Sequence, residues 1–517
     1  MSSKQQPALG AKIRAVIFDM GGVVVKSPFI AISSYEGEHG LPGNYINVAL
    51  SRRGSEGAFQ RYERGELEHE EFVEQWTEEL NDTEANNAAY SEAGVGAAAA
   101  AVGGGVAYLY VTDSRAGVHK YITAPLMRQV LDAEQAHGAA IFALKHGVCP
   151  VDRGTDSSVL EIELWGKRVS NPIGLAAGFD KNAEAVDGLF GLGFGLVEVG
   201  SITPLAQEGN ARPRVFRAAE HEAVVNRMGL PNCGAEESGA RLRSRFWRLV
   251  AAQSKQQGAT VAEVAGASNR SGVEGRLLGV NVSKGKGADS ASFDDYVRGL
   301  QSVGRYADYV VINVSCPNVR NMGAGTDAAV LGRTVAAVVA ARNAMAGFRP
   351  AVVLKIGPDS DVQQLRAVAQ VALDSRVDGI IATNTTRQRP ASAGSEGDAA
   401  AFAEEGGLSG APLRDAALAT TREMYRLTQG RIPIIGCGGI RTASDALAFA
   451  RAGASCVQVY TGMVYDGPGL AREIKDGVYT GMVYDGPGLA REIKDGVAQQ
   501  LKGRRWADVV GSDHRCD

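Results

Sequence analysis

The chain has 517 residues, of which 45% are hydrophobic and 22% are charged, and its formal net charge is −4. This composition is typical of a globular protein with a large core, and the charge gives no reason to expect a nucleic-acid partner. The six cysteines form no CxxC pair and the seven histidines show no HExxH spacing, so neither a disulfide framework nor a protein-bound metal is expected. Any redox chemistry would therefore need an organic cofactor.

Residues 1–92 begin with the strand-like run IRAVIFDMGGVVV and continue into polar, helix-favouring sequence. The run resembles the first motif of haloacid-dehalogenase-like hydrolases, with Asp19 at the position of the nucleophile. Phosphatases of that family use a second aspartate two residues later, where this chain has Gly21. We interpret 1–92 as a truncated hydrolase-like fragment without activity.

Residues 93–112 contain no charged side chain and are rich in Gly and Ala. Twenty such residues are long enough to cross a bilayer as a helix, so the segment predicts a single transmembrane anchor. A flexible Ala/Gly linker is the alternative.

Residues 113–150 are amphipathic and predict a pair of short helices broken around Asp132. Helices that follow an anchor and keep one apolar face can lie at a membrane surface. Ordinary packing of the pair against the main domain fits the pattern equally well.

From about Leu160, short apolar runs rich in β-branched residues alternate with helical segments, which is typical of a parallel sheet. Eight such units favour an α/β fold of the (β/α)8 (TIM) barrel type over residues 151–517. An additional stretch at 244–275 is expected to be a surface loop. The predicted strands are 172–179, 196–203, 277–283, 309–317, 351–358, 379–386, 432–439 and 456–462.

Polar side chains gather at the predicted carboxyl ends of these strands, where the active site of such a barrel forms. Several converging amides suit a flat heterocycle that carries both carbonyl and N–H groups. GCGG at 436–439 and YTG at 460–462 follow the last two strands, where this fold usually binds a phosphate, so a phosphate-bearing cofactor is expected. The strand-end residues are Lys181, Ser201, Asn281, Asn313, Cys316, Asn318, Lys355, Asn384 and Thr385.

The motifs NPIGLAAGFDKN, VEVGSITP, INVSCPN, TNTT and GCGGI occur in this order within 117–517. In sequence and spacing they resemble the dihydroorotate dehydrogenases of the quinone-dependent class (class 2). The resemblance implies FMN as cofactor and oxidation of (S)-dihydroorotate to orotate in pyrimidine biosynthesis. It also implies ubiquinone as electron acceptor and a single-pass protein of the mitochondrial inner membrane that contacts membrane lipid.

The resemblance carries three sets of site residues over to this chain. The FMN contacts would be Ala176, Ala177, Gly178, Gly200, Ser201, Asn281, Asn313, Lys355, Thr383, Ser409, Gly410, Gly438, Gly439, Tyr460 and Thr461. Dihydroorotate or orotate would contact Lys181, Asn226, Asn313, Asn318, Asn384 and Thr385. The helical pair at 113–150 would form the quinone entrance, with quinone contacts at His137, Ala140, Arg217 and Tyr460.

Cys316, in NVSCPN, stands where the family has its catalytic base. The quinone-dependent class normally has Ser at this position and the soluble class has Cys. A thiol has an ordinary pKa of about 8.5 and is a usable base without a relay, so Cys316 is the predicted base. The alternatives are oxidation with another acceptor as in the soluble class, a damaged membrane-tethered fusion, and an FMN barrel enzyme acting on another pyrimidine.

Residues 459–477 and 478–496 are an identical tandem copy, VYTGMVYDGPGLAREIKDG. The first copy continues the eighth predicted strand, whereas the second follows the helix that ends the first. Because a barrel of eight units has no ninth place, the second copy is expected outside the closed barrel. Its Tyr479 and Thr480 are therefore expected to bind no cofactor.

Overall fold

The computed structural model describes residues 36–38, 41, 45–64, 66–89, 107–289, 291–314, 328–392, 394–483 and 505–514. The chain divides into two compact units, Met1–Tyr110 and Val111–Asp517. Each is described by itself.

The described part of the first unit is helical. Its helices α2 (Tyr45–Arg52), α3 (Ala58–Glu63) and α4 (His69–Asn81) enclose a small core that includes Ile46, Phe72 and Trp76. The predicted strand-like run and Asp19 lie outside the described residues, so the hydrolase-like resemblance remains a prediction.

Most of the predicted anchor, residues 93–106, also lies outside the described residues, and residues 107–111 are helical. Within the described ranges, no helix combines the length and the apolar character needed to cross a membrane. The anchor therefore remains a prediction.

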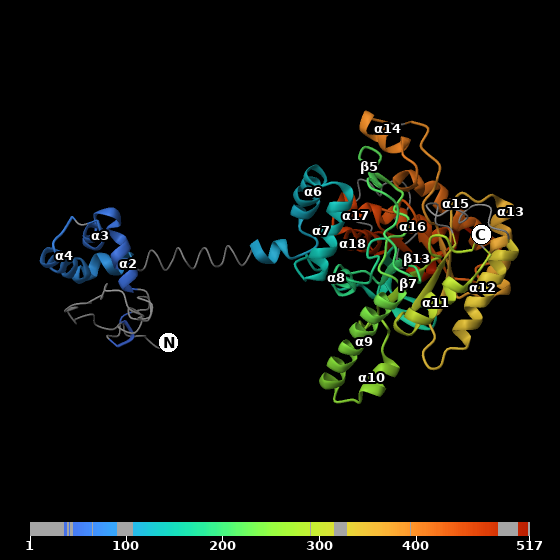
Figure 1. The fold of residues 1–517 in the computed structure, drawn as a ribbon, viewed down its shortest axis with the longest axis horizontal. Helices are drawn as coiled ribbons and strands as arrows, with labels where there is room; N and C mark the ends of the chain where they lie inside the picture. The colour runs from blue at the N-terminus through green and yellow to red at the C-terminus, as the bar shows by residue number, and fades with distance from the viewer. Residues whose placement is uncertain are drawn as a thin grey trace. The chain divides into compact units, whose positions relative to one another are not determined.

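The second unit is built on a closed barrel of eight parallel strands, so the predicted fold class is confirmed (Figure 1). The strands pair in chain order around the barrel, and the last one pairs with the first. Their continuous apolar runs are buried along almost their whole length, as expected when helices surround a parallel sheet. They are β3 (Ile173–Leu175), β4 (Leu196–Ile202), β7 (Leu277–Val282), β8 (Tyr309–Asn313), β9 (Ala351–Ile356), β10 (Gly379–Ala382), β12 (Ile434–Cys437) and β13 (Ala454–Val459).

A helix follows each barrel strand and packs outside it. Two of these helices begin at a side-chain cap, Asp361 or Thr442; the Asp361 carboxylate accepts from the backbone N–H of Gln364 at 2.8 Å. They are α8 (Val186–Gly191), α9 (Ala235–Gln257), α11 (Asp294–Val303), α12 (Ala328–Asn343), α13 (Val362–Asp374), α15 (Arg414–Thr428), α16 (Ala443–Arg451), α17 (Thr461–Asp466) and α18 (Leu470–Val483).

The prediction of a surface loop at 244–275 is wrong over most of its length. Helix α9 continues to Gln257, and α10 (Val261–Ala267) packs back on it through Phe246, Val250 and Val264. Figure 1 shows α9 and α10 extending together beyond the barrel. The Ser, Gly and Ala residues at 265–272 favoured a loop, whereas Phe246 and Val250 lie in the largely apolar stretch FWRLV.

A three-stranded antiparallel sheet stands beside the barrel, in the order β11 (Gly407–Gly410), β6 (Ala223–Asn226) and β5 (Val215–Ala218). Helix α14 (Glu396–Ala403) packs on it, and Figure 1 shows α14 next to β5. The sequence analysis did not predict this sheet, although it carries Arg217, Asn226 and Ser409.

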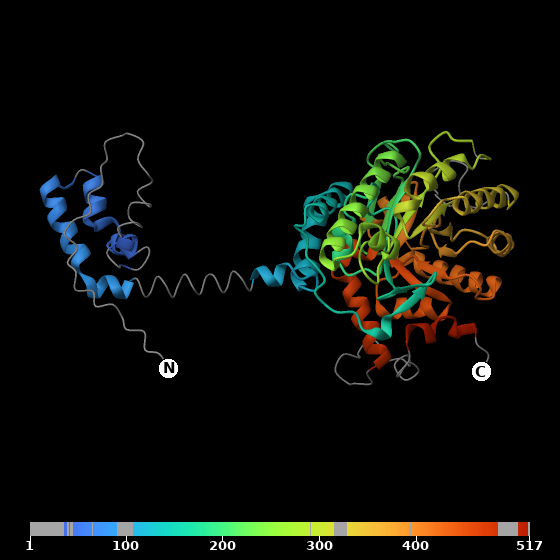
Figure 2. The ribbon, with the colours of Figure 1, turned by 90° about the horizontal axis from the view of Figure 1, so that it is seen from below.

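The predicted helical pair is confirmed. A π-helical turn, η2 (His119–Thr123), leads into α6 (Ala124–Val130), and α7 (Ala133–Lys145) follows. The break falls at Asp132, whose carboxylate accepts from the backbone N–H groups of Glu134 and Gln135, both at 2.8 Å. Helix α6 and the η2 turn pack against α17, whereas α7 packs against α8 and β5. Figures 1 and 2 show the helical pair, in blue-green, on the outside of the barrel.

The two copies of the tandem repeat enter different elements. In the first copy, Val459 ends β13, and α17 and most of α18 follow. The second copy begins inside α18, which continues as far as Val483. Among the described residues, the second copy supplies no strand to the barrel, as predicted.

Charged side chains of the first copy fasten α18 to the start of the barrel. Lys475 is fully buried, and its Nζ lies 2.8 Å from Asp152 Oδ2 and 2.7 Å from Asp156 Oδ1. Arg472 contacts the same two carboxylates at 2.8 and 3.2 Å. Burial by itself raises the pKa of Asp152, but the hydrogen bonds from Arg472 and Lys475 hold it below its ordinary value. Both aspartates therefore stay charged opposite Arg472 and Lys475, and Asp156 also lies 3.5 Å from Arg276 Nη2.

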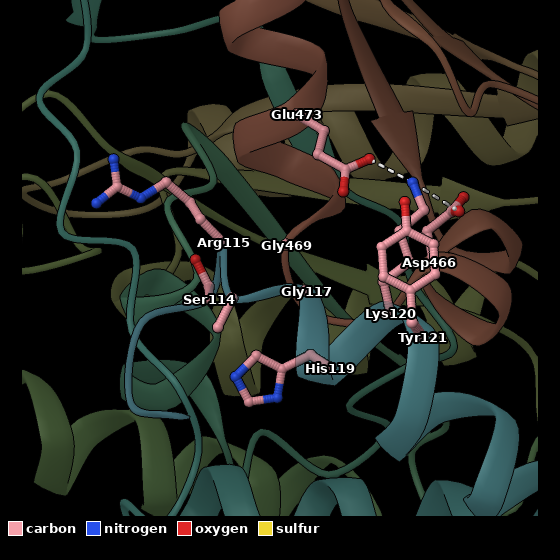
Figure 3. A pocket seen from close by; sticks show the side chains of 10 residues that line it. Ser114, Arg115, Gly117, His119, Lys120, Tyr121, Asp466, Gly469 and Glu473 are labelled. Carbon is pink, nitrogen blue, oxygen red and sulfur yellow. Dashed lines mark hydrogen bonds and ion pairs between the residues drawn. The ribbon is translucent and has the colours of Figure 1, made fainter. Parts of the chain in front are cut away.

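The first copy also holds the start of the helical pair. Lys120 donates to Glu473 Oε2 at 2.8 Å and lies 3.3 Å from Asp466 Oδ1 (Figure 3). The hollow beside these three side chains has a volume of about 200 Å³ and is also lined by Ser114 and His119.

Residues 505–514 pack against the barrel. Trp506, in α19 (Trp506–Val509), is fully buried and donates its indole N–H to Ser455 O at 2.8 Å. The backbone N–H of Gly511 donates to Ala450 O at 2.8 Å. The sequence pattern did not predict that these residues pack on the barrel.

Candidate active site

Four of the predicted strand-end residues meet inside the barrel, at the carboxyl ends of β4, β7, β8 and β9. They are Ser201, Asn281, Asn313 and Lys355, and each is at most 8% exposed. The Ser201 hydroxyl donates to Asn281 Oδ1, and Asn313 Nδ2 donates to Ser201 Oγ at 3.0 Å. The parallel strands thus bring together side chains that are far apart in the sequence.

Asn384 and Thr385, which follow β10, join this group. Asn384 Nδ2 donates to Asn313 Oδ1 at 3.2 Å, and the backbone N–H of Thr385 donates to Asn384 Oδ1 at 2.9 Å. Thr383 is buried, and its hydroxyl donates to Asn384 O at 2.8 Å. Residues predicted for the cofactor and for the substrate therefore share one hydrogen-bonded network.

Glu198 and Gln458 also belong to this network, and the sequence analysis missed both. Glu198 is fully buried and accepts from Asn281 Nδ2 at 2.9 Å and from Gln458 Nε2 at 2.7 Å. Its Oε1 lies 3.9 Å from the ammonium of Lys355. Both could have been noticed in the sequence, because each is a polar residue inside an otherwise apolar strand: Glu198 in LVEVGSI and Gln458 in ASCVQV.

Two glycine turns lie at the place predicted for the cofactor phosphate. A Cβ on Gly438 would lie 2.8 Å from Ala417 Cβ, and a Cβ on Gly410 would collide with Glu222 O; both glycines have positive φ. The hydroxyl of Thr461 is hydrogen-bonded to that of Ser409 at 2.8 Å. At both turns only glycine fits between the neighbouring protein atoms, and both turns stand where the resemblance places the phosphate end of the cofactor.

Lys181 and Asn226, predicted for the substrate, make contacts at the edge of this network. Lys181 Nζ donates to Gly178 O at 2.6 Å, and burial lowers the pKa of the ammonium to about 8. Asn226 Nδ2 donates to Gly407 O at 3.4 Å, two residues before Ser409. Each substrate candidate thus lies next to residues predicted to hold the cofactor.

A line of aromatic rings connects the helical pair to the cofactor residues. His137 on α7 donates from Nε2 to Phe179 O at 2.6 Å, and the two rings lie edge to face. Phe179 in turn packs edge to face on Tyr460, whose hydroxyl donates to Gly178 O at 3.4 Å. Burial, followed by the charge of Lys181, lowers the pKa of His137 to about 3, so this imidazole is neutral at physiological pH.

The other two predicted quinone residues lie near the same helices. Ala140 is partly buried against the core. The guanidinium of Arg217, on β5, donates to Leu131 O between α6 and α7. The predicted quinone residues thus lie on α7, at the break between α6 and α7, and at the aromatic contact with Phe179.

Cys316 and Asn318 lie outside the described residues, within 315–327. The assignment of the base therefore remains a prediction.

The helical pair presents large apolar side chains to solvent. Tyr121 is 75% exposed, Val130 70% and Phe142 61%, and Ile122 and Leu126 are also more than half exposed. An exposed apolar surface of this kind is typical of a segment that meets a membrane or a partner.

Residues 159–482 match the family model described as dihydroorotate dehydrogenase. The chain belongs to the dihydroorotate dehydrogenase family. The mitochondrial dihydroorotate dehydrogenase (quinone) of Schizosaccharomyces pombe is 38% identical over 418 residues, which cover 79% of this chain and 89% of that protein. The mouse enzyme of the same name is 43% identical over 73% of this chain and 91% of its own.

A crystal structure gives the same result for the fold. It is the dihydroorotate dehydrogenase from Eimeria tenella in complex with ferulenol, with a TM-score of 0.64 and 34% identity. The alignment covers 76% of this chain and 99% of that one. Both sequence relatives carry the quinone-dependent name, which supports the predicted class.

Proposed function

We propose that this protein oxidises (S)-dihydroorotate to orotate with FMN as cofactor and passes the electrons to ubiquinone, in de novo pyrimidine biosynthesis. The observation that carries the proposal is the buried network of Ser201, Asn281, Asn313 and Asn384 beside Lys355, at the strand ends of a barrel of this family. Its amides and its cation offer the donors and acceptors that a flavin and a pyrimidine require.

The chain's residues fit FMN in two respects. Ser201, Asn281 and Lys355 would lie against the ring system, and the turns at Gly410 and Gly438 with Thr461 would hold the phosphate end. When bound, FMN supplies the acceptor for the hydride that leaves C6 of the substrate. Lys355 would place a buried positive charge where negative charge develops.

The substrate residues would bind and orient the pyrimidine. Asn313 and Asn384 present a carbonyl oxygen and an amide N–H in fixed positions, and Lys181 supplies a cation for the orotate carboxylate. Asn226, Asn318 and Thr385 would complete this set. Cys316 would take the proton from C5 as its thiolate.

The quinone would enter through the helical pair. The line from His137 through Phe179 to Tyr460 ends at Gly178, so the pair and the cofactor residues are in contact through packed rings. The neutral imidazole of His137 removes one charge from this apolar route.

The exposed apolar side chains of α6 and η2 suit a membrane surface, where ubiquinone is dissolved. On this basis we extend the proposal to membrane lipid as a partner and the mitochondrial inner membrane as the location. Residues 1–92 would be a hydrolase-like fragment, 93–112 the anchor, 113–150 the quinone entrance and 151–517 the catalytic barrel.

The second candidate function is oxidation of dihydroorotate with an electron acceptor other than ubiquinone. One observation favours it: Cys316 stands where the resemblance gives Ser for the quinone-dependent class. Both candidates use the same substrate site and differ only in how the reduced cofactor is reoxidised.

The test is an assay of the purified full chain in detergent, with dihydroorotate and either a short-chain ubiquinone analogue or fumarate. We expect reduction of the quinone analogue, and a loss of about 10²-fold or more in kcat for Cys316→Ala, because general-base catalysis contributes at least that much. Cys316→Ser is the matched control, because it keeps the size of the side chain and changes the acidity of the base.

If fumarate and not the quinone analogue reoxidises the reduced flavin, ubiquinone is rejected as the electron acceptor. A wild-type rate for Cys316→Ala would reject the base.

A further inference from the structure

One carboxylate lies inside the barrel and closes the hydrogen-bonded network of the site. Glu198 on β4 is fully buried and accepts hydrogen bonds through both of its oxygens. Oε1 accepts from Asn281 Nδ2 at 2.9 Å, and Oε2 accepts from Gln458 Nε2 at 2.7 Å. A carboxylate that accepts on both sides offers no hydrogen, so each amide that contacts it must present its NH₂ group.

This requirement passes from residue to residue toward the substrate. With its NH₂ group on Glu198, Asn281 has its Oδ1 left for the Ser201 hydroxyl, which donates to it. The Ser201 oxygen can then accept, and it does so from Asn313 Nδ2 at 3.0 Å.

The direction continues one residue further. Asn313 turns its Oδ1 toward Asn384, whose Nδ2 donates to it at 3.2 Å. Each of the four hydrogen bonds from Asn384 to Glu198 therefore runs in the same direction, with the carboxylate as the final acceptor. The chain ends at two residues that are expected to contact the substrate.

Gln458 indicates that the carboxylate decides the orientation of its neighbours. Its Nε2 faces Glu198, while its buried Oε1 has no hydrogen-bond partner among the described residues. A buried amide oxygen without a partner costs free energy. The amide keeps this orientation because the reverse one would place an oxygen against the carboxylate.

We propose that Glu198 is a positioning residue that sets the orientation of the Asn313 and Asn384 amides, and thereby selects which of their atoms face the pyrimidine. This inference rests on the proposed function, because it takes these amides as the substrate contacts. An orientation that is fixed before binding requires no rearrangement when the substrate arrives. Glu198 itself need not touch the substrate.

Two substitutions separate direction from size. Glu198→Gln keeps the length of the side chain but adds an NH₂ group, so it no longer forces Asn281 into one orientation. Glu198→Asp removes one methylene and keeps a group that only accepts. If Glu198 acts only by filling space, Glu198→Asp should weaken orotate binding more than Glu198→Gln. If it sets the orientation of the amides, Glu198→Gln should weaken binding more.

The measurement is the dissociation constant of orotate, determined by calorimetry on the FMN-loaded full chain. We expect binding to weaken about tenfold in Glu198→Gln and by no more than about threefold in Glu198→Asp, since one misdirected buried hydrogen bond has an effect of this order. KM for dihydroorotate should follow the same order. Wild-type orotate affinity in Glu198→Gln, or weaker binding in Glu198→Asp than in Glu198→Gln, would overturn the inference.

The wild-type protein tests the proposed function separately. If it neither binds orotate nor oxidises dihydroorotate, the proposed function fails, and the inference is then judged on FMN affinity, because Ser201 and Asn281 are expected cofactor contacts. An FMN affinity that falls in the order wild type, Glu198→Asp, Glu198→Gln would support the proposal that Glu198 sets the orientation of the amides. Any other order would reject it.

Discussion

Residues 459–477 and 478–496 have the same sequence, but the structure places their first residues in different elements. Val459 ends the barrel strand β13, whereas Val478 lies within the helix α18, and both side chains are buried. What differs is the preceding segment, ASCVQ in one case and EIKDG in the other. The segment that precedes each copy and the tertiary contacts that it can make decide between strand and helix here, because the two sequences are identical.

The charged side chains of the first copy make specific ion pairs. In the first copy, Lys475 and Arg472 are buried against Asp152 and Asp156, and Glu473 binds Lys120. Within the ranges that the structure describes, one such pair of buried aspartates lies next to α18, and Lys475 and Arg472 of the first copy already contact it, so the second copy is not expected to make the same contacts. The first copy is therefore expected to contribute both the stabilising ion pairs and the cofactor contacts, and two matched pairs of substitutions and one deletion test this.

The largest difference is expected at the buried lysine. Lys475→Met would remove one of the cations that Asp152 and Asp156 contact at a buried site, which should lower the free energy of unfolding by about 3–5 kcal/mol. Lys494→Met makes the same change in the second copy and should cost no more than about 0.5 kcal/mol. Denaturant unfolding measures both, and equal losses would break the comparison.

A smaller difference is expected in cofactor binding. Thr461→Ala removes the hydroxyl that is bonded to Ser409, and FMN should dissociate about five times faster, because a hydrogen bond contributes roughly 1 kcal/mol. Thr480→Ala is the matched control and should leave the rate unchanged. Flavin fluorescence on dilution reports both rates, and the assignment fails if Thr480→Ala is the variant that releases FMN.

The smallest effect is expected from deleting residues 478–496. Val497 would then follow Gly477 directly and could occupy the buried place of Val478. The free energy of unfolding should change by less than about 1 kcal/mol, and FMN should be retained. Loss of flavin in a folded deletion variant would identify the second copy as the one that binds.

The sequence predicted the barrel well because each strand is a continuous apolar run between polar turns, a pattern that few folds share. The break of the helical pair was predictable for a local reason, since Asp132 caps α7. Ser201, Asn281, Asn313 and Lys355 were also selected correctly as one group, because parallel strands place their carboxyl ends together.

The remaining features depend on contacts between distant segments. Glu198 and Gln458 lie inside apolar strands, and their pairing across the barrel is visible only in three dimensions. The β11–β6–β5 sheet joins strands separated by about 180 residues in the chain. The packing of α10 on α9 joins apolar residues of two helices, and the burial of Trp506 depends on contacts with other elements.

The docking of Trp506 also explains why a tandem duplication is tolerated at this point of the chain. The second copy begins at Val478, which is buried in α18, and ends at residue 496, so its remaining residues lie in the chain between this buried side chain and that of Trp506. Lengthening a connection between two held points costs only about 0.6 kcal/mol for each doubling, because the entropy of closing a loop grows with the logarithm of its length. The end of α18 is therefore a natural site for inserting a foreign peptide or a reporter without reaching the flavin site.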